Sequence, residues 1–313
     1  MILTNVSGEV LFVPTITKVG ATFAIGASLT VGDELRVDPV VSALIAAGDL
    51  SVTGYSSDPG SPATQEEVSL AFADGEMSGL QLALDAGDPT HDILIGVGVC
   101  MGGSPAKPLR LASALVKRID ATWAAGTAAG GLRPGPPPAT VSAWYFVWLL
   151  ENTTTGVLDA MFDASSTGAN APAGWAARRI LGVVRTDGAS LIVPFTQRGG
   201  VVKWKTPILD FTTGASSTSQ VVVPLTVPAL PKVEALLQVV VDAESVYIHS
   251  VDEVDVAPSA TLAPLASAGA SAGIATGQVV ASAIGGAVAM RALVGARSVH
   301  IATLGWTWDR SVV

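Results

Sequence analysis

The chain of 313 residues has little of what most chemical functions require. It contains a single cysteine, Cys100, so an intrachain disulfide framework is excluded and a small buried thiol is the expected role. Only 14% of the residues are charged, and 17 Lys and Arg stand against 26 Asp and Glu. This acidic balance, without any basic run, argues against binding to the phosphate backbone of nucleic acids.

The motifs of common active sites are also missing. The three histidines, His91, His249 and His300, are far apart and none has the spacing of metal ligands. There is no Gly-x-Ser-x-Gly motif and no P-loop, and Gly96-x-Gly98 lacks the third glycine of a dinucleotide fingerprint. We therefore expect no enzyme activity, no cofactor and no metal ion. Paired carboxylates of a glycoside hydrolase remain the alternative, because their pairing is not visible in a sequence.

Acidic residues gather in one region, at Asp242, Glu244, Asp252, Glu253 and Asp255. Oxygen-rich loops can hold Ca²⁺, but this spacing matches no EF-hand. A solvated edge that repels other acidic edges is the favoured interpretation.

Apolar residues make up 49% of the chain, and many of them are Ala and Val. A chain so poor in charge is expected to bury surface in an oligomer. The stretch Ile274–Met290 is apolar, but Gln278, Ser282 and Gly285–Gly286 interrupt it, and Ala and Gly gain little from leaving water. We therefore expect no membrane insertion. The first ten residues lack a basic segment followed by an apolar one, so no secretory signal is expected either.

Residues 1–56 are predicted to form a small α+β module. Short strands are expected near residues 10–13, 22–25 and 50–52. Asp38 can cap a helix that Gly48 ends. The apolar stripe of this expected anchor helix consists of Val40, Val41, Leu44 and Ile45.

Residues 57–84 begin with turn-forming residues and are predicted to be a linker. Thr64 and Glu67 fit a capping box, so a short helix could begin there.

Residues 85–313 are predicted to be a mainly β domain, an antiparallel β-sandwich of the jelly-roll kind. Many short segments alternate between apolar and polar residues, and turn residues separate them at regular spacing. Residues 141–150 and 157–162 predict one hairpin. Residues 180–184 and 191–195 predict another, with a tight turn at Asp187–Gly188. Further strands are expected at 201–204, 221–227, 236–241, 245–249, 279–284, 287–293 and 299–304.

Three segments resemble a domain found in tail-fibre, spike and neck-appendage proteins of tailed bacteriophages. The first is Leu109–Leu132, LRLASALVKRIDATWAAGTAAGGL. The second is Arg178–Asp187, RRILGVVRTD, followed by the strand Ile192–Phe195 and Gln197. The third is Thr303–Arg310, TLGWTWDR, which departs from the pattern by one residue at Trp308.

This resemblance spans residues 85–313 approximately, and LIAAGDL at Leu44–Leu50 resembles small anchor modules at the start of such proteins. It implies a virion structural protein, assembled in the bacterial cytoplasm as a homo-oligomer, with a trimer as the first expectation. Residues 1–56 would bind other phage tail, neck or head proteins. The resemblance supplies no catalytic residues. It favours a strand at Leu109–Ala112 and a strand or irregular segment at Val116–Trp123, where an amphipathic helix is the alternative.

Four cations stand out in these segments: Lys117, Arg118, Arg178 and Arg179. They could contact an acidic host-surface glycan, which would make the protein a carbohydrate-binding adhesion module. The alternative, which we favour, is ion pairing with Asp120, Asp159 or Asp163 inside the domain. The aromatic residues Trp144, Tyr145, Phe146 and Trp148 could stack on sugars, but their place on a predicted strand favours the core.

Overall fold

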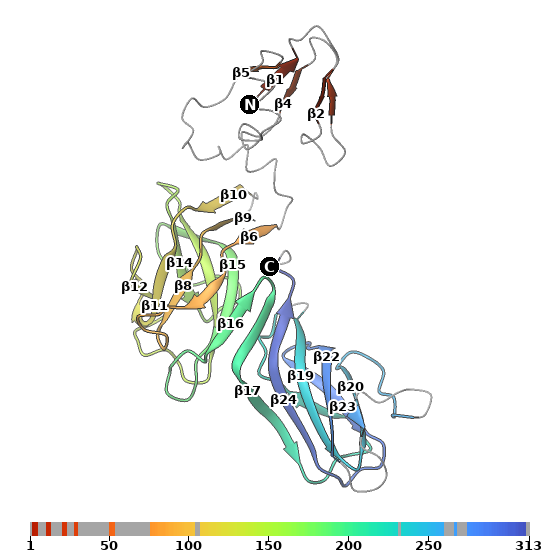
Figure 1. The fold of residues 1–313 in the computed structure, drawn as a ribbon. Helices are drawn as coiled ribbons and strands as arrows, with labels where there is room; N and C mark the ends of the chain where they lie inside the picture. The colour runs from red at the N-terminus through yellow and green to blue at the C-terminus, as the bar shows by residue number, and fades with distance from the viewer. Residues whose placement is uncertain are drawn as a thin grey trace. The chain divides into compact units, whose positions relative to one another are not determined.

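The computed structural model describes the strand residues 2–5, 11–13, 21–23, 28–30 and 50–53, and then residues 76–103, 107–230, 233–259, 266–267 and 274–310. The chain divides into two compact units, Met1–Ala71 and Phe72–Val313. All regular structure in these described residues is β-strand (Figure 1). The expectation of a mainly β protein is confirmed.

The first unit contains two small antiparallel sheets. Strand β1 (Ile2–Asn5) lies between β4 (Ser28–Thr30) and β5 (Leu50–Thr53), and β2 (Leu11–Val13) pairs with β3 (Ala21–Phe23). The predicted anchor helix with Val40, Val41, Leu44 and Ile45 lies outside the described residues, as does the predicted helix start at Thr64.

The second unit begins with strands inside the predicted linker 57–84. Strand β6 (Met77–Gly79) pairs with β9 (Gly98–Gly102), and β7 (Leu82–Leu84) pairs with β8 (Asp92–Ile95). We call residues 76–194 the first lobe and residues 195–310 the second lobe. The other strands of the first lobe are β10 (Lys107–Leu111), β11 (Leu115–Thr122), β12 (Ala129–Arg133), β13 (Trp144–Asn152), β14 (Leu158–Asp163) and β15 (Trp175–Arg185).

The first lobe contains a seven-stranded sheet, β15-β13-β14-β12-β11-β8-β7, and a three-stranded sheet, β10-β9-β6. The predicted hairpin is β13 with β14, in antiparallel register from Phe146↔Asp163 to Glu151↔Leu158. Strand β13 is buried along almost its whole length, on both faces. Tyr145, Phe146 and Trp148 are therefore core residues, as the sequence favoured, and they are not available to stack on sugars.

Two details depart from the expected pattern. The predicted hairpin of 180–184 with 191–195 is reduced to an isolated bridge between Thr186 and Ile192, around a loop in which the Asp187 carboxylate accepts the N–H groups of Ala189 and Leu191. Strand β12 runs parallel to both of its neighbours, β11 and β14, so the seven-stranded sheet is mixed. The segment Leu115–Thr122 is a strand, so the helical alternative is wrong.

The second lobe contains a five-stranded and a four-stranded sheet, both antiparallel. The first has the order β16-β17-β24-β19-β22 and the second β18-β23-β20-β21. These strands are β16 (Phe195–Arg198), β17 (Val201–Thr213), β18 (Val221–Pro224), β19 (Val233–Asp242), β20 (Ser245–Ser250), β21 (Ala266–Ser267), β22 (Ile274–Ser282), β23 (Ala287–Ala292) and β24 (Val299–Trp308). Buried apolar residues of both sheets, such as Val239 and Met290, belong to one core.

Candidate functional site

The ammonium group of Lys117 lies inside the first lobe. The side chains of Lys117 and Asp159 are 1% and 2% exposed, and their Nζ and Oδ1 atoms are 3.2 Å apart. Lys117 Nζ also donates to the backbone oxygens of Ala124, at 2.7 Å, and Gly126, at 3.1 Å. Burial lowers the pKa of Lys117, and the charge of Asp159 opposes that shift. Lys117 is therefore a structural cation and is removed from the set that could touch a glycan.

This ion pair fixes the glycine-rich loop that follows β11. The Asp159 carboxylate accepts the N–H of Gly126 at 2.8 Å and that of Ala160 at 2.7 Å. Lys117 also lies 5.5 Å from the ring centre of Trp123, whose Nε1 donates to the Ala160 oxygen at 3.0 Å. Parallel neighbours usually need a dozen or more connecting residues. Here the chain returns over residues 123–128, and these polar contacts hold it in place.

Gly130 and Gly131 allow the returning strand to approach. A Cβ atom on Gly130 would lie 2.1 Å from the backbone oxygen of Thr122, and one on Gly131 would lie 2.8 Å from the ring of Phe162. No side chain fits at either distance. The pair Gly130–Gly131 is therefore required for β12 to pack against both β11 and β14.

Arg118 and Arg178 are each paired with a carboxylate. Arg118 donates to Asp120 through Nε at 3.1 Å and Nη2 at 3.0 Å, on the exposed side of β11. Arg178 donates through Nε to the buried Glu151 at 2.8 Å, and Lys107 pairs with the same carboxylate. Burial opposes ionisation of Glu151, but the hydrogen bonds and charges of Lys107 and Arg178 together outweigh it, and the pKa of Glu151 is lowered. The partner of Arg118 was predicted, whereas Glu151 was not.

Arg179 and Arg310 lie at the contact between the two lobes. Arg179 Nη2 donates to the backbone oxygen of Arg310. Arg310 in turn donates to the backbone oxygens of Gly79, Leu80 and Leu181, at 3.1, 2.9 and 3.2 Å. Burial lowers the pKa of Arg179, and it lowers that of Arg310 to about 10. Residues 178–187 and 303–310, which are far apart in the sequence, thus meet here.

Tryptophan rings make another contact between the two lobes. Trp204 and Trp306 have ring centres 5.0 Å apart, and Trp144 of the first lobe lies 5.7 Å from Trp306. The alternation of β24 shifts at Gly305, so that both Trp306 and Trp308 are buried. A Cβ on Gly305 would lie 2.1 Å from the Val202 oxygen, which makes glycine necessary at this irregularity. The extra residue in the third segment is therefore accommodated in the strand.

Glu244 connects three loops at one end of the second lobe. It is 2% exposed and accepts the N–H groups of Ser245, Val294 and Gly295 and the hydroxyl of Ser216. Burial raises the pKa of Glu244, but these hydrogen bonds outweigh burial and the net pKa is lowered. The carboxylate is satisfied by the protein itself. Asp255 of the same predicted acidic cluster pairs with Arg291 at 2.9 Å.

His91 and His300 have ordinary structural partners. His91 Nδ1 lies 2.8 Å from Asp88 Oδ2, and hydrogen bonds from Thr90 and His91 lower the pKa of Asp88 to about 2. His300 Nδ1 lies 2.7 Å from the Thr212 hydroxyl. Among the residues that the structure describes, no three His, Cys, Asp or Glu side chains are grouped to hold a metal ion. Within the same residues, no helical segment has the length and hydropathy needed to cross a bilayer.

Sequence reasoning missed Glu151, Arg310 and the pair Trp123–Trp175. The rings of this pair are half-buried, 5.3 Å apart and edge to face. Glu151 carried a signal, since a carboxylate at the end of the apolar run VWLLE needs a buried cation. Arg310 carried none, because its acceptors are backbone oxygens.

In the described residues, the charged side chains named above hold loops and strands in place. They do not form a cluster with the geometry of a reactive centre. Comparisons of the chain with protein-family models, with curated proteins and with solved structures find no match.

Proposed function

We propose that this chain is a bacteriophage virion structural protein, a homo-oligomeric appendage without enzyme activity. The observation that carries the proposal is the structural role of the three segments that resemble phage appendage proteins. The first forms the Lys117–Asp159 loop, and the second and third meet through Arg179 and Arg310. These residues hold a loop and the two lobes in place. Such a structural role suits a component of a particle, whose function depends on its shape.

The finer architecture that we propose for the second lobe is a jelly roll. Four strand pairs support it, because β17 neighbours β24, β18 neighbours β23, β19 neighbours β22 and β20 neighbours β21. This nesting arises when one long antiparallel hairpin, β17–β20 against β21–β24, is rolled into two sheets. Such double sheets occur in viral and lectin domains.

Residues 1–56 are proposed as the anchor that binds other tail, neck or head proteins, and a trimer is the proposed assembly. The test is sedimentation velocity of the full chain, together with electron microscopy of phage particles labelled with an antibody against it. A trimer and label on the particle are expected. A chain that stays monomeric at all concentrations and never labels a particle would overturn the proposal.

A second candidate is a carbohydrate-binding adhesion module, and the half-buried pair Trp123–Trp175 favours it. Partly exposed indoles that are held rigidly can cover an apolar face of a sugar. Glycan-array binding by the full chain, lost in Trp175→Ala but kept in Val157→Ala, would support it. Val157 is exposed and lies outside this pair. No binding to any glycan would exclude it.

A further inference from the structure

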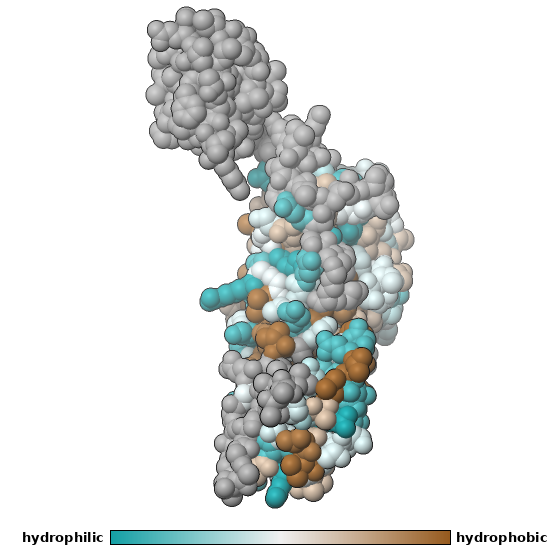
Figure 2. All heavy atoms as spheres, turned by 90° about the vertical axis from the view of Figure 1, so that its right-hand side faces the viewer, coloured by the Kyte–Doolittle hydropathy of each residue, from teal (hydrophilic) through white to brown (hydrophobic). Residues whose placement is uncertain are grey.

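One long stretch of the second lobe carries no charge. Between Asp255 and Arg291 the sequence contains no Asp, Glu, Lys or Arg, although the whole chain has a formal net charge of −9. Strand β22 lies within this stretch. The side of the molecule on which β22 and β20 lie in Figure 1 faces the viewer in Figure 2, where brown apolar patches interrupt the polar surface of the second lobe.

Strand β22 is at an edge of the five-stranded sheet. It pairs with β19 from Asp242↔Ile274 to Glu234↔Ser282, and among the described strands β19 is its single hydrogen-bonded neighbour. Natural sheets protect such edges with charged residues, prolines, bulges or short strands. The sequence of β22, IATGQVVAS, has neither charge nor proline, and its pairing with β19 is regular. Val280 near its end is 60% exposed.

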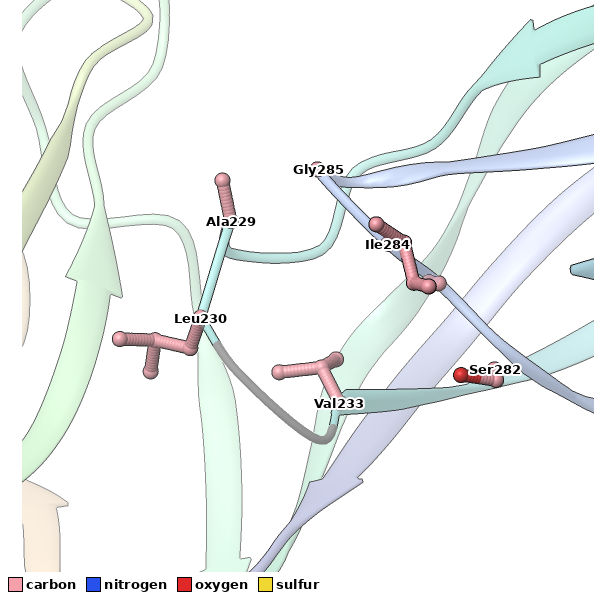
Figure 3. Close-up of a pocket in the computed structure, with 7 residues that line it drawn as sticks. Ala229, Leu230, Val233, Ser282, Ile284 and Gly285 are labelled. Atoms are coloured by element: carbon pink, nitrogen blue, oxygen red, sulfur yellow. The ribbon is translucent and has the colours of Figure 1, made fainter. Parts of the chain in front are cut away.

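An apolar pocket adjoins the end of this strand (Figure 3). It has a volume of about 400 Å³ and is lined by Ala229, Leu230, Val233, Ser282, Ala283, Ile284 and Gly285. Ile284 at its rim is 46% exposed, whereas Val233 at its wall is buried. An edge strand with no second hydrogen-bonded partner among the described strands, followed by an apolar pocket, is the arrangement that accepts a further strand together with one of its apolar side chains.

We propose that the edge of β22 is a contact between two copies of this chain, with the two β22 strands paired antiparallel. The charge of the molecule argues for a second copy. Two chains of net charge −9 repel each other over most of their surfaces, and this edge brings no charged side chain of β22 into the contact. A basic partner, by contrast, would find no carboxylate on β22 to pair with. Antiparallel pairing of identical strands is also a two-fold contact that closes with two copies.

This contact goes beyond the proposed function. A three-fold assembly joins two unlike surfaces of neighbouring copies, so a two-fold contact must use a separate patch. The test compares the full chain with Val280→Lys, which places a charge on the edge. The matched control is Val222→Lys on β18, where Val222 is 58% exposed in the same lobe. Circular dichroism and thermal melting confirm that each variant is folded.

Sedimentation velocity over a series of concentrations then gives the mass of each protein. The expected result is that the wild type and Val222→Lys reach twice the mass of Val280→Lys. Equal masses for all three proteins would overturn the β22 contact. A trimer in all three would leave the proposed trimer intact while removing this inference. A wild-type dimer and a monomeric Val280→Lys would support the inference and remove the trimer.

If Val280→Lys does not fold, Ile284→Glu at the rim of the pocket replaces it. A wild type of twice the mass of this variant is again the expected result, and equal masses would again overturn the contact. A cross-link gives an independent measurement. Gln278→Cys near the middle of β22 is expected to form an intermolecular disulfide under mild oxidation, since the chain's own Cys100 is buried. A Gln278→Cys chain that remains monomeric on denaturing gels after oxidation would contradict the antiparallel pairing.

Discussion

Replacing Lys117 by Met tests how the glycine-rich loop is held. Met has a similar length but no charge, so the Asp159 carboxylate would remain buried without its cation. The Lys117 and Asp159 side chains are 1% and 2% exposed, so solvent screens the pair very little. Removing one partner of a buried pair costs about 3–5 kcal/mol. Because two N–H groups still donate to Asp159, we expect a loss of about 3 kcal/mol, at the lower end of that range.

The assay is urea unfolding followed by tryptophan fluorescence, with Arg118→Met as the control. Arg118 neighbours Lys117 on β11, but its pair with Asp120 is exposed and screened by solvent, so its loss is expected to cost little stability. For a unit of this size, 3 kcal/mol corresponds to a fall in Tm of about 6–12 °C. Hydrogen exchange should also speed up at Gly126, whose N–H bonds to Asp159.

A second variant separates the charge from the shape of the loop. Asn at position 159 removes the uncompensated charge and keeps an oxygen for the N–H of Gly126. The double variant Lys117→Met with Asp159→Asn is therefore expected to be more stable than Lys117→Met alone. If Lys117→Met loses no more stability than Arg118→Met, or if Asp159→Asn gives no relief, the ion pair does not hold the loop and our reasoning is refuted.

Three further predictions concern other parts of the fold. Gly130→Ala is expected to unfold the second unit or lower its Tm strongly, because its Cβ would lie 2.1 Å from the Thr122 oxygen, whereas Gly188→Ala, with open space around it, should melt like the wild type. The lowered pKa of Glu244 means that its contribution to stability is complete above its unfolded-state pKa and is lost as the pH falls through the lower folded-state pKa. Melting curves from pH 7 to pH 3 should therefore fall less steeply for Glu244→Gln, and equal slopes would argue against this role. Burial raises the pKa of Cys100 to about 11, so its thiol should resist iodoacetamide at pH 8 until urea is added; rapid labelling of the native protein would contradict its burial.

Local sequence pattern predicted the strands well for a physical reason. In β19, the buried residues alternate with exposed or half-buried ones from Val233 to Asp242, and this period of two follows from strand geometry alone. The hairpin of β13 and β14 was predicted too, because its turn residues lie between its two apolar segments. The helical alternative at Leu115–Thr122 failed because the pattern LVKRIDAT suits either structure, and the pairing of β11 with β8 decides it.

The candidate cations show where sequence reasoning stops. Asp120 was a predictable partner of Arg118, since both lie on one face of the same strand. Asp159 was one of three possible partners for the other cations, and only the sheet order brings it to Lys117. Glu151 was not predicted as the partner of Arg178, because their contact depends on β13 and β15 being neighbours in the sheet. Which carboxylate meets which cation depends on strand register, and register is a property of the fold.

By itself, the sequence determined that the protein is mainly β, that it is acidic and poor in charge, and that Cys100 has no disulfide partner within the chain. These properties follow from composition and from short-range alternation. The tertiary structure alone decided that β12 runs parallel to β11, that Arg179 meets Arg310, and that the uncharged strand β22 lies at an edge. Each of these depends on contacts between residues that come together only when the sheets form, and local propensity carries no information about them.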